Sequence, residues 1–285
     1  MRMLKLAIQK NGRLSEQSLE LLRTCGIRLS NGDRKLRAAS TNFPLEVLFL
    51  RDDDIPQYVE QGVADIGILG KNEVLEKARK VEMLDQLGFA ACRLSLAIPR
   101  EESYAGPAYF NGKRVATSYP RILQRFFAEQ QIEAEIEEIG GSVEIAPGIG
   151  LADGIFDIVS TGSTLLMNGL KEVETVLCSE AVLIATPGIA SEPLALLEQL
   201  RFRIRAAQNA VIHKYILLNA PDTALEEICS LIPGMKSPTI LPLAREGWSS
   251  IHSVVGEDVF WEVTGQLKRA GAEGILVVPI EKMIL

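Results

Sequence analysis

The chain has 285 residues, of which 47% are apolar and 24% charged, and its formal net charge is −7. This length predicts two or three packed units, and the composition is that of an ordinary globular protein. The acidic balance argues against a general nucleic-acid binder, although a local cluster of Lys and Arg can still bind phosphate. No stretch is apolar enough for a signal peptide or a membrane span, so we expect a cytoplasmic protein without nucleic-acid or membrane partners.

The four cysteines are scattered, and none of them has the Cys-x-x-Cys spacing of a zinc site. Free thiols in a reducing compartment are therefore expected. Only two histidines, His213 and His252, are present, which argues against a His-rich metal site or a Ser-His-Asp triad. Cys92 has no evident base partner and is expected to be buried rather than catalytic.

The first part of the chain alternates apolar strands with helices, the pattern of α/β proteins. The expected strands are Leu4–Ile8, Leu45–Leu50 and Asp65–Leu69, and the expected helices are Glu16–Cys25 and Asp54–Gln61. A second segment repeats the alternation. Its expected strands are Arg114–Thr117, Glu133–Ile139 and Ile155–Val159, and its expected helices are Pro120–Gln130 and Glu144–Leu151.

The two segments can be matched to each other. Gly62-Val-Ala-Asp65-Ile66 resembles Gly154-Ile-Phe-Asp157-Ile158, and an acid, Asp52 or Glu144, stands thirteen residues before each aspartate. One interpretation is that all βαβ units look alike. The other is an internal duplication, which predicts two α/β lobes with ligands bound between them.

The last eighty or so residues have a different pattern. Expected strands are Ala210–Leu218, Thr239–Leu243, Ser250–Val255 and Gly274–Pro279, and expected helices are Thr223–Leu231 and Val259–Ala270. This is the order of a ferredoxin-like α+β domain. We therefore expect lobe I over 1–90 with 178–202, lobe II over 91–177 and a C-terminal domain over 203–285.

The strongest local signal is the run that follows the strand ending at Val159. It consists of Ser160, Thr161, Gly162, Ser163 and Thr164. Backbone N–H groups and hydroxyls in such a turn can bind phosphate, and glycine permits a close backbone approach. The same residues can also serve as an ordinary helix cap. We call this run the phosphate loop.

Three acids, Glu144, Asp153 and Asp157, precede the phosphate loop. Phosphate repels carboxylates, but ribose hydroxyls donate hydrogen bonds to them, so phosphate donors beside these acceptors would suit a 5-phosphoribosyl group. Each acid taken alone can instead be a surface charge.

Cations follow the first strands of lobe I. Lys10 and Arg13 come after Leu4–Ile8, and Arg51 comes after Leu45–Leu50, where they can hold polyphosphate groups. Each of them can also be a solvated surface charge. The acids Asp52-Asp53-Asp54 suit Mg²⁺, but we favour a helix start, where negative charge is stabilised by the helix dipole.

These motifs together resemble the ATP phosphoribosyltransferase family, in its long form with a C-terminal regulatory domain. The family pattern in this sequence is Glu144, Gly150, Ala152, Ile155, Asp157, Ile158, Thr161, Gly162, Thr164 and Leu165. The opening Gln-Lys-x-Gly-Arg-Leu, Arg51-Asp-Asp-Asp-Ile-Pro56 and Cys92-Arg93-Leu94-Ser95-Leu96-Ala97 also look familial.

The resemblance implies two periplasmic-binding-protein-like lobes that catalyse a Mg²⁺-dependent transfer. The 5-phosphoribosyl group of phosphoribosyl pyrophosphate would pass to N1 of ATP, which opens histidine biosynthesis and releases pyrophosphate. Ser160–Thr164 would hold the 5-phosphate, the three acids the ribose, and Lys10, Arg13 and Arg51 the polyphosphates. Histidine would inhibit by binding the C-terminal domain, near Asn219 and Thr239, in a homodimer that assembles to a homohexamer.

Two other functions remain open at this stage. One is a solute-binding or ligand-sensing module of the same fold, because fold does not fix function. The other is an allosteric subunit that senses a metabolite but has no catalytic activity.

Overall fold

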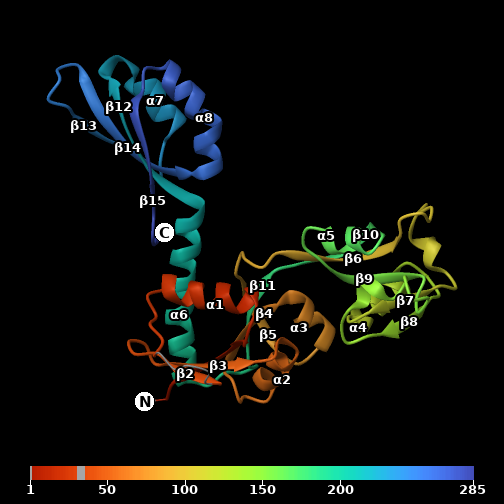
Figure 1. Cartoon of the computed structure of the whole chain (residues 1–285). Helices are drawn as coiled ribbons and strands as arrows, with labels where there is room; N and C mark the ends of the chain where they lie inside the picture. The colour runs from red at the N-terminus through yellow and green to blue at the C-terminus, as the bar shows by residue number, and fades with distance from the viewer. Residues whose placement is uncertain (1, 31–35) are drawn as a thin grey trace. The chain divides into compact units, whose positions relative to one another are not determined.

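The computed structural model describes residues 2–30 and 36–285 (Figure 1). These residues form two compact units. The first unit runs to Leu22 and continues over Ile27–Leu196, and the second comprises Arg23–Gly26 and Leu197–Leu285. The described part of the first unit contains two sheets, which belong to lobes I and II, and that of the second contains one.

Lobe I is built on a sheet of order β2-β3-β1-β4-β11-β5. Its strands are β1 (Leu4–Gln9), β2 (Arg37–Ala39), β3 (Leu45–Leu50), β4 (Ile66–Gly70), β5 (Glu82–Gln86) and β11 (Ala181–Ala185). Strands β3, β1 and β4 are parallel, and β11 runs antiparallel to β4. The central strands are nearly continuous apolar runs because parallel strands are covered on both faces. The helices of this lobe are α1 (Arg13–Thr24), η1 (Asp52–Asp54), α2 (Ile55–Glu60) and α3 (Lys71–Lys77).

Lobe II has a sheet of order β10-β6-β9-β7-β8. Its strands are β6 (Cys92–Pro99), β7 (Arg114–Thr117), β8 (Glu135–Glu138), β9 (Gly154–Val159) and β10 (Leu170–Ser179). Its helices are η2 (Pro107–Phe110), α4 (Pro120–Glu129), η3 (Val143–Ile145) and α5 (Ser163–Met167). One core cluster contains Phe110, Phe127 and Phe156, and another contains Val143, Ile155 and Leu165. The alternation along β9 assigns Phe156 and Ile155 to opposite faces of the sheet.

Both lobes share one strand order. In each sheet, the parallel strand that comes first in the sequence (β1 or β7) lies between the other two parallel strands. An antiparallel strand (β11 or β6) lies on the far side of the third parallel strand. The aspartate just before each third strand accepts a hydrogen bond from the backbone of the first. Lys5 N donates to Asp65 Oδ2 at 2.9 Å, and Arg114 N donates to Asp153 Oδ2 at 2.8 Å. The structural equivalent of Asp65 is therefore Asp153, and the match with Asp157 was wrong by four residues.

Several element boundaries differ from the prediction, and three of them differ by three residues or more. The helix expected over Glu144–Leu151 shrinks to η3 and turns, because Pro147 and two glycines interrupt it; Gly150 has φ +75°. Helix α1 begins at Arg13 rather than at Glu16. The strand expected from Ala210 begins only at His213, since α6 (Ser191–Ile212) continues to that point.

Polar side chains of lobe I form hydrogen bonds with lobe II. Glu76 of α3 accepts hydrogen bonds from Arg121 N at 2.9 Å and from Ile122 N at 3.0 Å, and so caps the start of α4. Asn72 bonds Ser179 and Tyr119 through its side chain. The lobes are thus joined by specific polar contacts.

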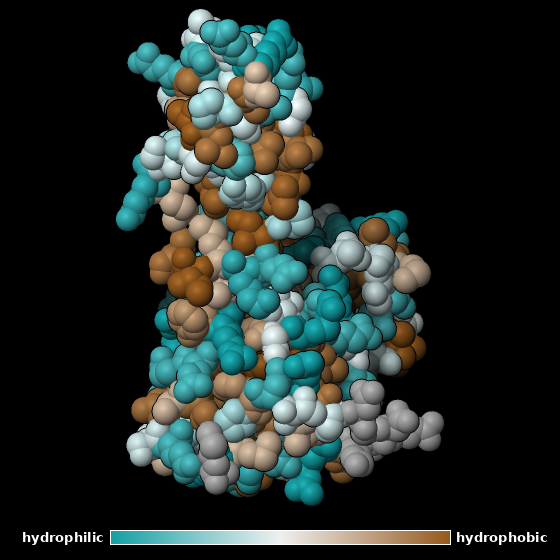
Figure 2. Space-filling view, turned by 90° about the vertical axis from the view of Figure 1, so that its left-hand side faces the viewer, coloured by the Kyte–Doolittle hydropathy of each residue, from teal (hydrophilic) through white to brown (hydrophobic). Residues whose placement is uncertain are grey.

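The second unit contains a four-stranded antiparallel sheet of order β13-β14-β12-β15. Its strands are β12 (His213–Pro221), β13 (Thr239–Pro242), β14 (Trp248–Gly256) and β15 (Glu273–Pro279), with helices η4 (Asp222–Ala224), α7 (Leu225–Leu231) and α8 (Glu257–Arg269). This topology confirms the ferredoxin-like prediction. Figure 2 shows apolar residues at the surface of this second unit, in the upper part of the view. Among the residues described, no helix has the length and apolarity needed to cross a membrane.

Candidate active site

The phosphate loop follows the carboxyl end of β9, at the edge where open α/β sheets bind ligands. Gly162 has φ +79° and precedes α5, so a side chain there would be strained. Thr161 Oγ1 and Ser163 Oγ lie 3.0 Å apart, and both residues are exposed. Hydroxyls and backbone of the loop are therefore available to an anion.

Two of the predicted acids lie near the loop. Asp157 is half-buried on β9, and Glu144 is half-buried on η3. Burial raises the pKa of Asp157; a hydrogen bond from Ile158 N opposes the shift, and the charge of Glu144 adds to it. The two carboxylates therefore lie within electrostatic reach of each other, beside the strand that enters the loop.

Asp153, the third predicted acid, does not lie beside the phosphate loop. It precedes the first residue of β9, at the opposite end of the strand from the loop. Ser160 is seven positions further along the chain, which corresponds to about 23 Å of extended strand. Its carboxylate bonds Arg114 N and lies 3.9 Å from Arg114 Nε. Its observed contacts hold β9 to β7.

The predicted cations of lobe I lie at the carboxyl edge of its sheet. Gln9 and Leu50 are neighbours in the register of β1 and β3, and Lys10 N donates to the Leu50 carbonyl at 2.7 Å. Lys10 and Arg51 therefore leave the sheet side by side. Both side chains are exposed, and Arg51 Nε lies 3.5 Å from Asp53 Oδ1. Arg13, also exposed, begins α1 directly after this edge.

The acidic run Asp52–Asp54 forms η1, which leads into α2, as the helix-start interpretation predicted. Over residues 2–30 and 36–285, no group of three or more His, Cys, Asp or Glu side chains could hold a metal ion.

Sequence reasoning missed a polar cluster between the lobes, made of Asn72, Glu73 and Tyr119. Asn72 Nδ2 bonds Glu73 Oε1 at 3.2 Å and Tyr119 Oη at 3.4 Å. Burial, followed by the charge of Asp52, raises the pKa of Glu73 to about 7. Burial also raises the pKa of Tyr119, with contributions from Glu73 and from Asp157 of lobe II. Tyr119 thus stands between carboxylates of both lobes; no sequence motif marks Asn72 or Glu73.

One cavity, of about 550 Å³, contains the start of the phosphate loop. It is lined by Ser160, Arg93, Cys92, Ser179 and Lys71, among others. Cys92 is half-buried, and burial raises its pKa, which keeps the thiol protonated.

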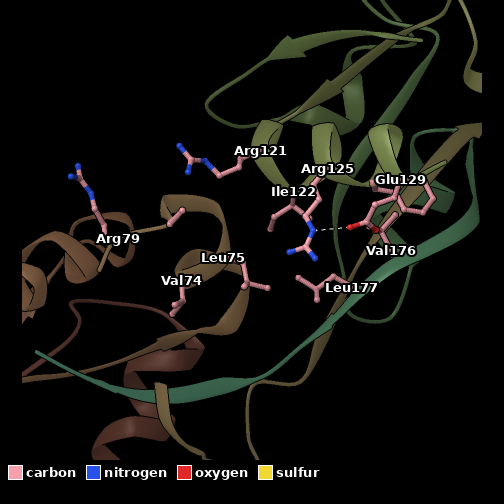
Figure 3. A pocket seen from close by; sticks show the side chains of 11 residues that line it. Val74, Leu75, Arg79, Arg121, Ile122, Arg125, Glu129, Val176 and Leu177 are labelled. Atoms are coloured by element: carbon pink, nitrogen blue, oxygen red, sulfur yellow. Dashed lines mark hydrogen bonds and ion pairs between the residues drawn. The ribbon is translucent and has the colours of Figure 1, made fainter. Parts of the chain in front are cut away.

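A second cavity, of about 670 Å³, lies between α3 and α4 (Figure 3). Leu75, Ile122 and Leu177 lie along it, and Arg125 is paired with Glu129 at 2.8 Å. None of the predicted site residues lines it.

The predicted effector residues both lie in the sheet of the second unit. Asn219, expected in a loop, is on β12, and Thr239 begins β13. The register assigns both to one sheet face, with His252 of β14 beside Thr239. Tyr215 Oη lies 2.7 Å from His252 Nδ1. Sequence reasoning missed these two polar side chains, which alternation along β12 and β14 could have assigned to this face.

The two lobes and the third sheet define a class: a two-lobed α/β protein with a C-terminal α+β domain. The family model described as ATP phosphoribosyltransferase matches residues 51–206, and that of the HisG C-terminal domain matches residues 210–282. The chain belongs to the ATP phosphoribosyltransferase family, as its motifs predicted.

Individual relatives agree with this. The ATP phosphoribosyltransferase of Cytophaga hutchinsonii is 58% identical over 281 residues, 99% of this chain and 98% of that protein. That of Bacteroides thetaiotaomicron is 56% identical over 283 residues, 99% of this chain and all of that one. A solved chain of the ATP phosphoribosyl transferase (HisG:HisZ) complex from Thermotoga maritima is 30% identical with a TM-score of 0.61. It covers 71% of this chain and 99% of its own.

Proposed function

We propose that this chain transfers the 5-phosphoribosyl group of phosphoribosyl pyrophosphate to N1 of ATP and releases pyrophosphate. This reaction is the first step of histidine biosynthesis. One observation carries the conclusion: relatives named ATP phosphoribosyltransferase match over essentially the whole chain at 56–58% identity. As a member of that family, the protein is a pentosyltransferase. The same matches weigh against the solute-binding module and the non-catalytic subunit.

The chemistry of this reaction suggests a role for each of the predicted site residues. Ser160–Thr164 bind the 5-phosphate, and Glu144 and Asp157 accept hydrogen bonds from the ribose hydroxyls. Lys10, Arg13 and Arg51 hold polyphosphate oxygens and stabilise the charge on the leaving pyrophosphate. Asp153 is left out because its carboxylate bonds Arg114 N at the far end of β9.

The reaction needs no side-chain base for its nucleophile. Adenine N1 carries a lone pair, so it can attack the anomeric carbon without losing a proton first. The protein's task is to align N1 with that carbon and to exclude water. The polar contacts between the lobes support this alignment, because they join the walls that carry the two sets of residues.

Mg²⁺ is proposed as a companion of the substrate rather than a resident ion. Mg²⁺ is commonly bound through substrate phosphates with one or two carboxylates. Bound to the pyrophosphate group of the substrate, Mg²⁺ would neutralise part of its negative charge.

The remaining proposals concern regulation and assembly. Histidine is proposed to bind the C-terminal domain through Asn219 and Thr239, whose amide and hydroxyl match its carboxylate and ammonium groups. We further propose a homodimer that assembles to a homohexamer, located in the cytoplasm.

Pyrophosphate release by the purified full chain tests the activity. The assay supplies ATP, phosphoribosyl pyrophosphate and Mg²⁺, and leaves out each in turn. We expect release only with all three present. Equal release without ATP would indicate simple hydrolysis and would contradict the proposal.

A further inference from the structure

Arg93 reaches from β6 to the first residue of the phosphate loop. Its Nη1 donates to the Ser160 carbonyl oxygen at 3.1 Å. Arg93 is paired in register with Val159, the last residue of β9, so the guanidinium lies where the chain leaves the sheet. Arg93 and Ser160 also line the same cavity.

The guanidinium is itself held in place from β10. Nε and Nη2 donate to Oε1 and Oε2 of Glu172 at 2.5 and 2.6 Å, a two-bond fork. Ser95 Oγ and Thr175 Oγ1 donate to the same carboxylate at 2.8 and 3.3 Å. These bonds, that from Arg93 foremost, hold the pKa of Glu172 below its ordinary value. The arginine therefore has a fixed orientation, which a lysine could not reproduce.

The residues that hold the guanidinium also lie close to β9, the strand that carries Asp157. Strand β6 lies between β10 and β9, and Ser95 is paired in register with Asp157. Residues paired across strands share a sheet face. Arg93, Ser95 and Glu172, which we call the Arg93 network, therefore adjoin both the loop entry and Asp157.

The other end of the loop has its own anchors. Leu165 is buried in a core cluster, and Asn168 Nδ2 donates to the Thr164 carbonyl at 3.0 Å. Between the two ends, the hydroxyls of Thr161 and Ser163 contact each other. The loop is thus fixed at its entry by Arg93 and at its exit by α5.

We propose that Arg93 is a positioning residue, which fixes the entry of the phosphate loop so that its donors are arranged before the 5-phosphate arrives. This rests on the proposed function, in which the loop binds that phosphate. Arg93 acts through Ser160 rather than on the substrate, because Glu172 already neutralises its charge. A loop arranged in advance loses less conformational freedom on binding, and this improves affinity.

The test uses Arg93→Met and Arg93→Lys in the full chain. Losing a charge-assisted anchor should raise KM for phosphoribosyl pyrophosphate about tenfold or more in Arg93→Met and less in Arg93→Lys. KM for ATP should change by less than about twofold. Without substrates, the backbone amides of residues 158–168 should exchange hydrogen faster in Arg93→Met, a readout that needs no activity.

Arg125→Met is the matched control. It removes an Arg–Glu pair of 2.8 Å on α4, away from the loop, and should leave both KM values and the loop exchange unchanged. A double variant, Arg93→Met with Glu172→Gln, should raise KM no further than Arg93→Met alone, because both residues act through one contact. If Arg93→Met folds poorly, Arg93→Lys and Ser95→Ala give the same measurements.

Unchanged KM for phosphoribosyl pyrophosphate together with unchanged loop exchange would overturn the positioning role. A loss shared equally with Arg125→Met would overturn it too. Failure of the proposed function looks different, because the wild-type chain would then release no pyrophosphate. Impaired Thr161→Val beside a normal Arg93→Met would reject only the role of Arg93.

Discussion

Asp65 and Asp153 are structural equivalents in the two lobes. Each precedes the third parallel strand and accepts a hydrogen bond from the start of the first, at 2.9 and 2.8 Å. The backbone bonds are reciprocal: Asp65 N donates to the Lys5 carbonyl, and Asp153 N to that of Arg114. The aspartates fasten the amino-terminal ends of the strands, away from the edge that carries the phosphate loop.

Replacing these aspartates should affect stability rather than substrate use. Asp153→Ala should lower the free energy of unfolding by about 1 kcal/mol, since its side chain is 41% exposed. Asp65→Ala should cost about 2–3 kcal/mol, because Asp65 is buried and also paired with Arg2. Urea titration measures both. A tenfold rise in KM for phosphoribosyl pyrophosphate in Asp153→Ala would instead restore this acid to the ribose site.

Thr161→Val keeps the shape of the phosphate loop but removes one hydroxyl. A phosphate oxygen without its donor should cost about 1.5–3 kcal/mol, or roughly ten- to a hundredfold in kcat/KM for phosphoribosyl pyrophosphate. Steady-state kinetics with each substrate varied checks this. Unchanged values would remove Thr161 from the phosphate site.

Arg13→Ala tests the cationic edge of lobe I. The side chain is exposed at the start of α1, so Tm should stay nearly unchanged while kcat/KM falls at least about tenfold. Thermal unfolding and initial rates on the same preparation separate the two effects. A variant that unfolds readily yet is fully active while folded would make Arg13 a structural residue.

Glu73 predicts a pH dependence of stability. Its pKa rises from an ordinary 4.5 to about 7 in the folded state, mainly through burial and the nearby charge of Asp52. The folded chain therefore binds this proton more tightly than the unfolded chain. The free energy of unfolding should fall as pH rises from 4.5 to 7 and then level off, by on the order of 2–3 kcal/mol.

Glu73→Gln should lack this contribution, since an amide does not titrate in this range. Urea titrations at about pH 5 and pH 8 compare it with the wild type and with Glu129→Gln, whose side chain is 57% exposed. The wild type and Glu129→Gln should lose more stability between the two pH values than Glu73→Gln. Equal losses in all three would show that Glu73 ionises normally.

Asn219→Ala tests the effector site. If the amide binds the amino-acid group of histidine, its loss should weaken histidine binding about tenfold in calorimetry. Because Asn219 lies on β12 in the C-terminal unit, kcat without histidine should stay unchanged. Thr239→Val should also weaken histidine binding without changing kcat, since Thr239 and Asn219 lie on the same face of the sheet. Unweakened binding in both variants would exclude this face as the histidine site.

The sequence predicted the helices and strands better than it predicted which residues of lobe I correspond to which residues of lobe II. Strand Arg114–Thr117 and the ferredoxin-like order were predicted correctly because short apolar runs and turn residues mark the elements locally. The repeat was matched on Asp-Ile pairs, but Gly62-Val-Ala-Asp65 corresponds to Gly150-Leu-Ala-Asp153. That signal was present: both glycines have positive φ, at +69° and +75°.

Contacts between distant segments could not be predicted. Arg93 was seen only as part of a familial motif, because its partners Ser160 and Glu172 lie 67 and 79 residues away. Likewise, Glu73 meets Tyr119 only after two lobes have folded and joined. The phosphate loop could be proposed from the sequence alone because its hydroxyl residues and its glycine are five consecutive residues.

The position of β11 has a consequence for synthesis of the chain. Lobe II is built from the continuous stretch 92–179, whereas the sheet of lobe I needs β11 between β4 and β5. At about 5–20 residues per second, the first five strands wait roughly ten seconds for that strand to leave the ribosome. During that time lobe II is being synthesised, and β4 and β5 of the nascent chain keep unpaired edges until β11 pairs with both of them.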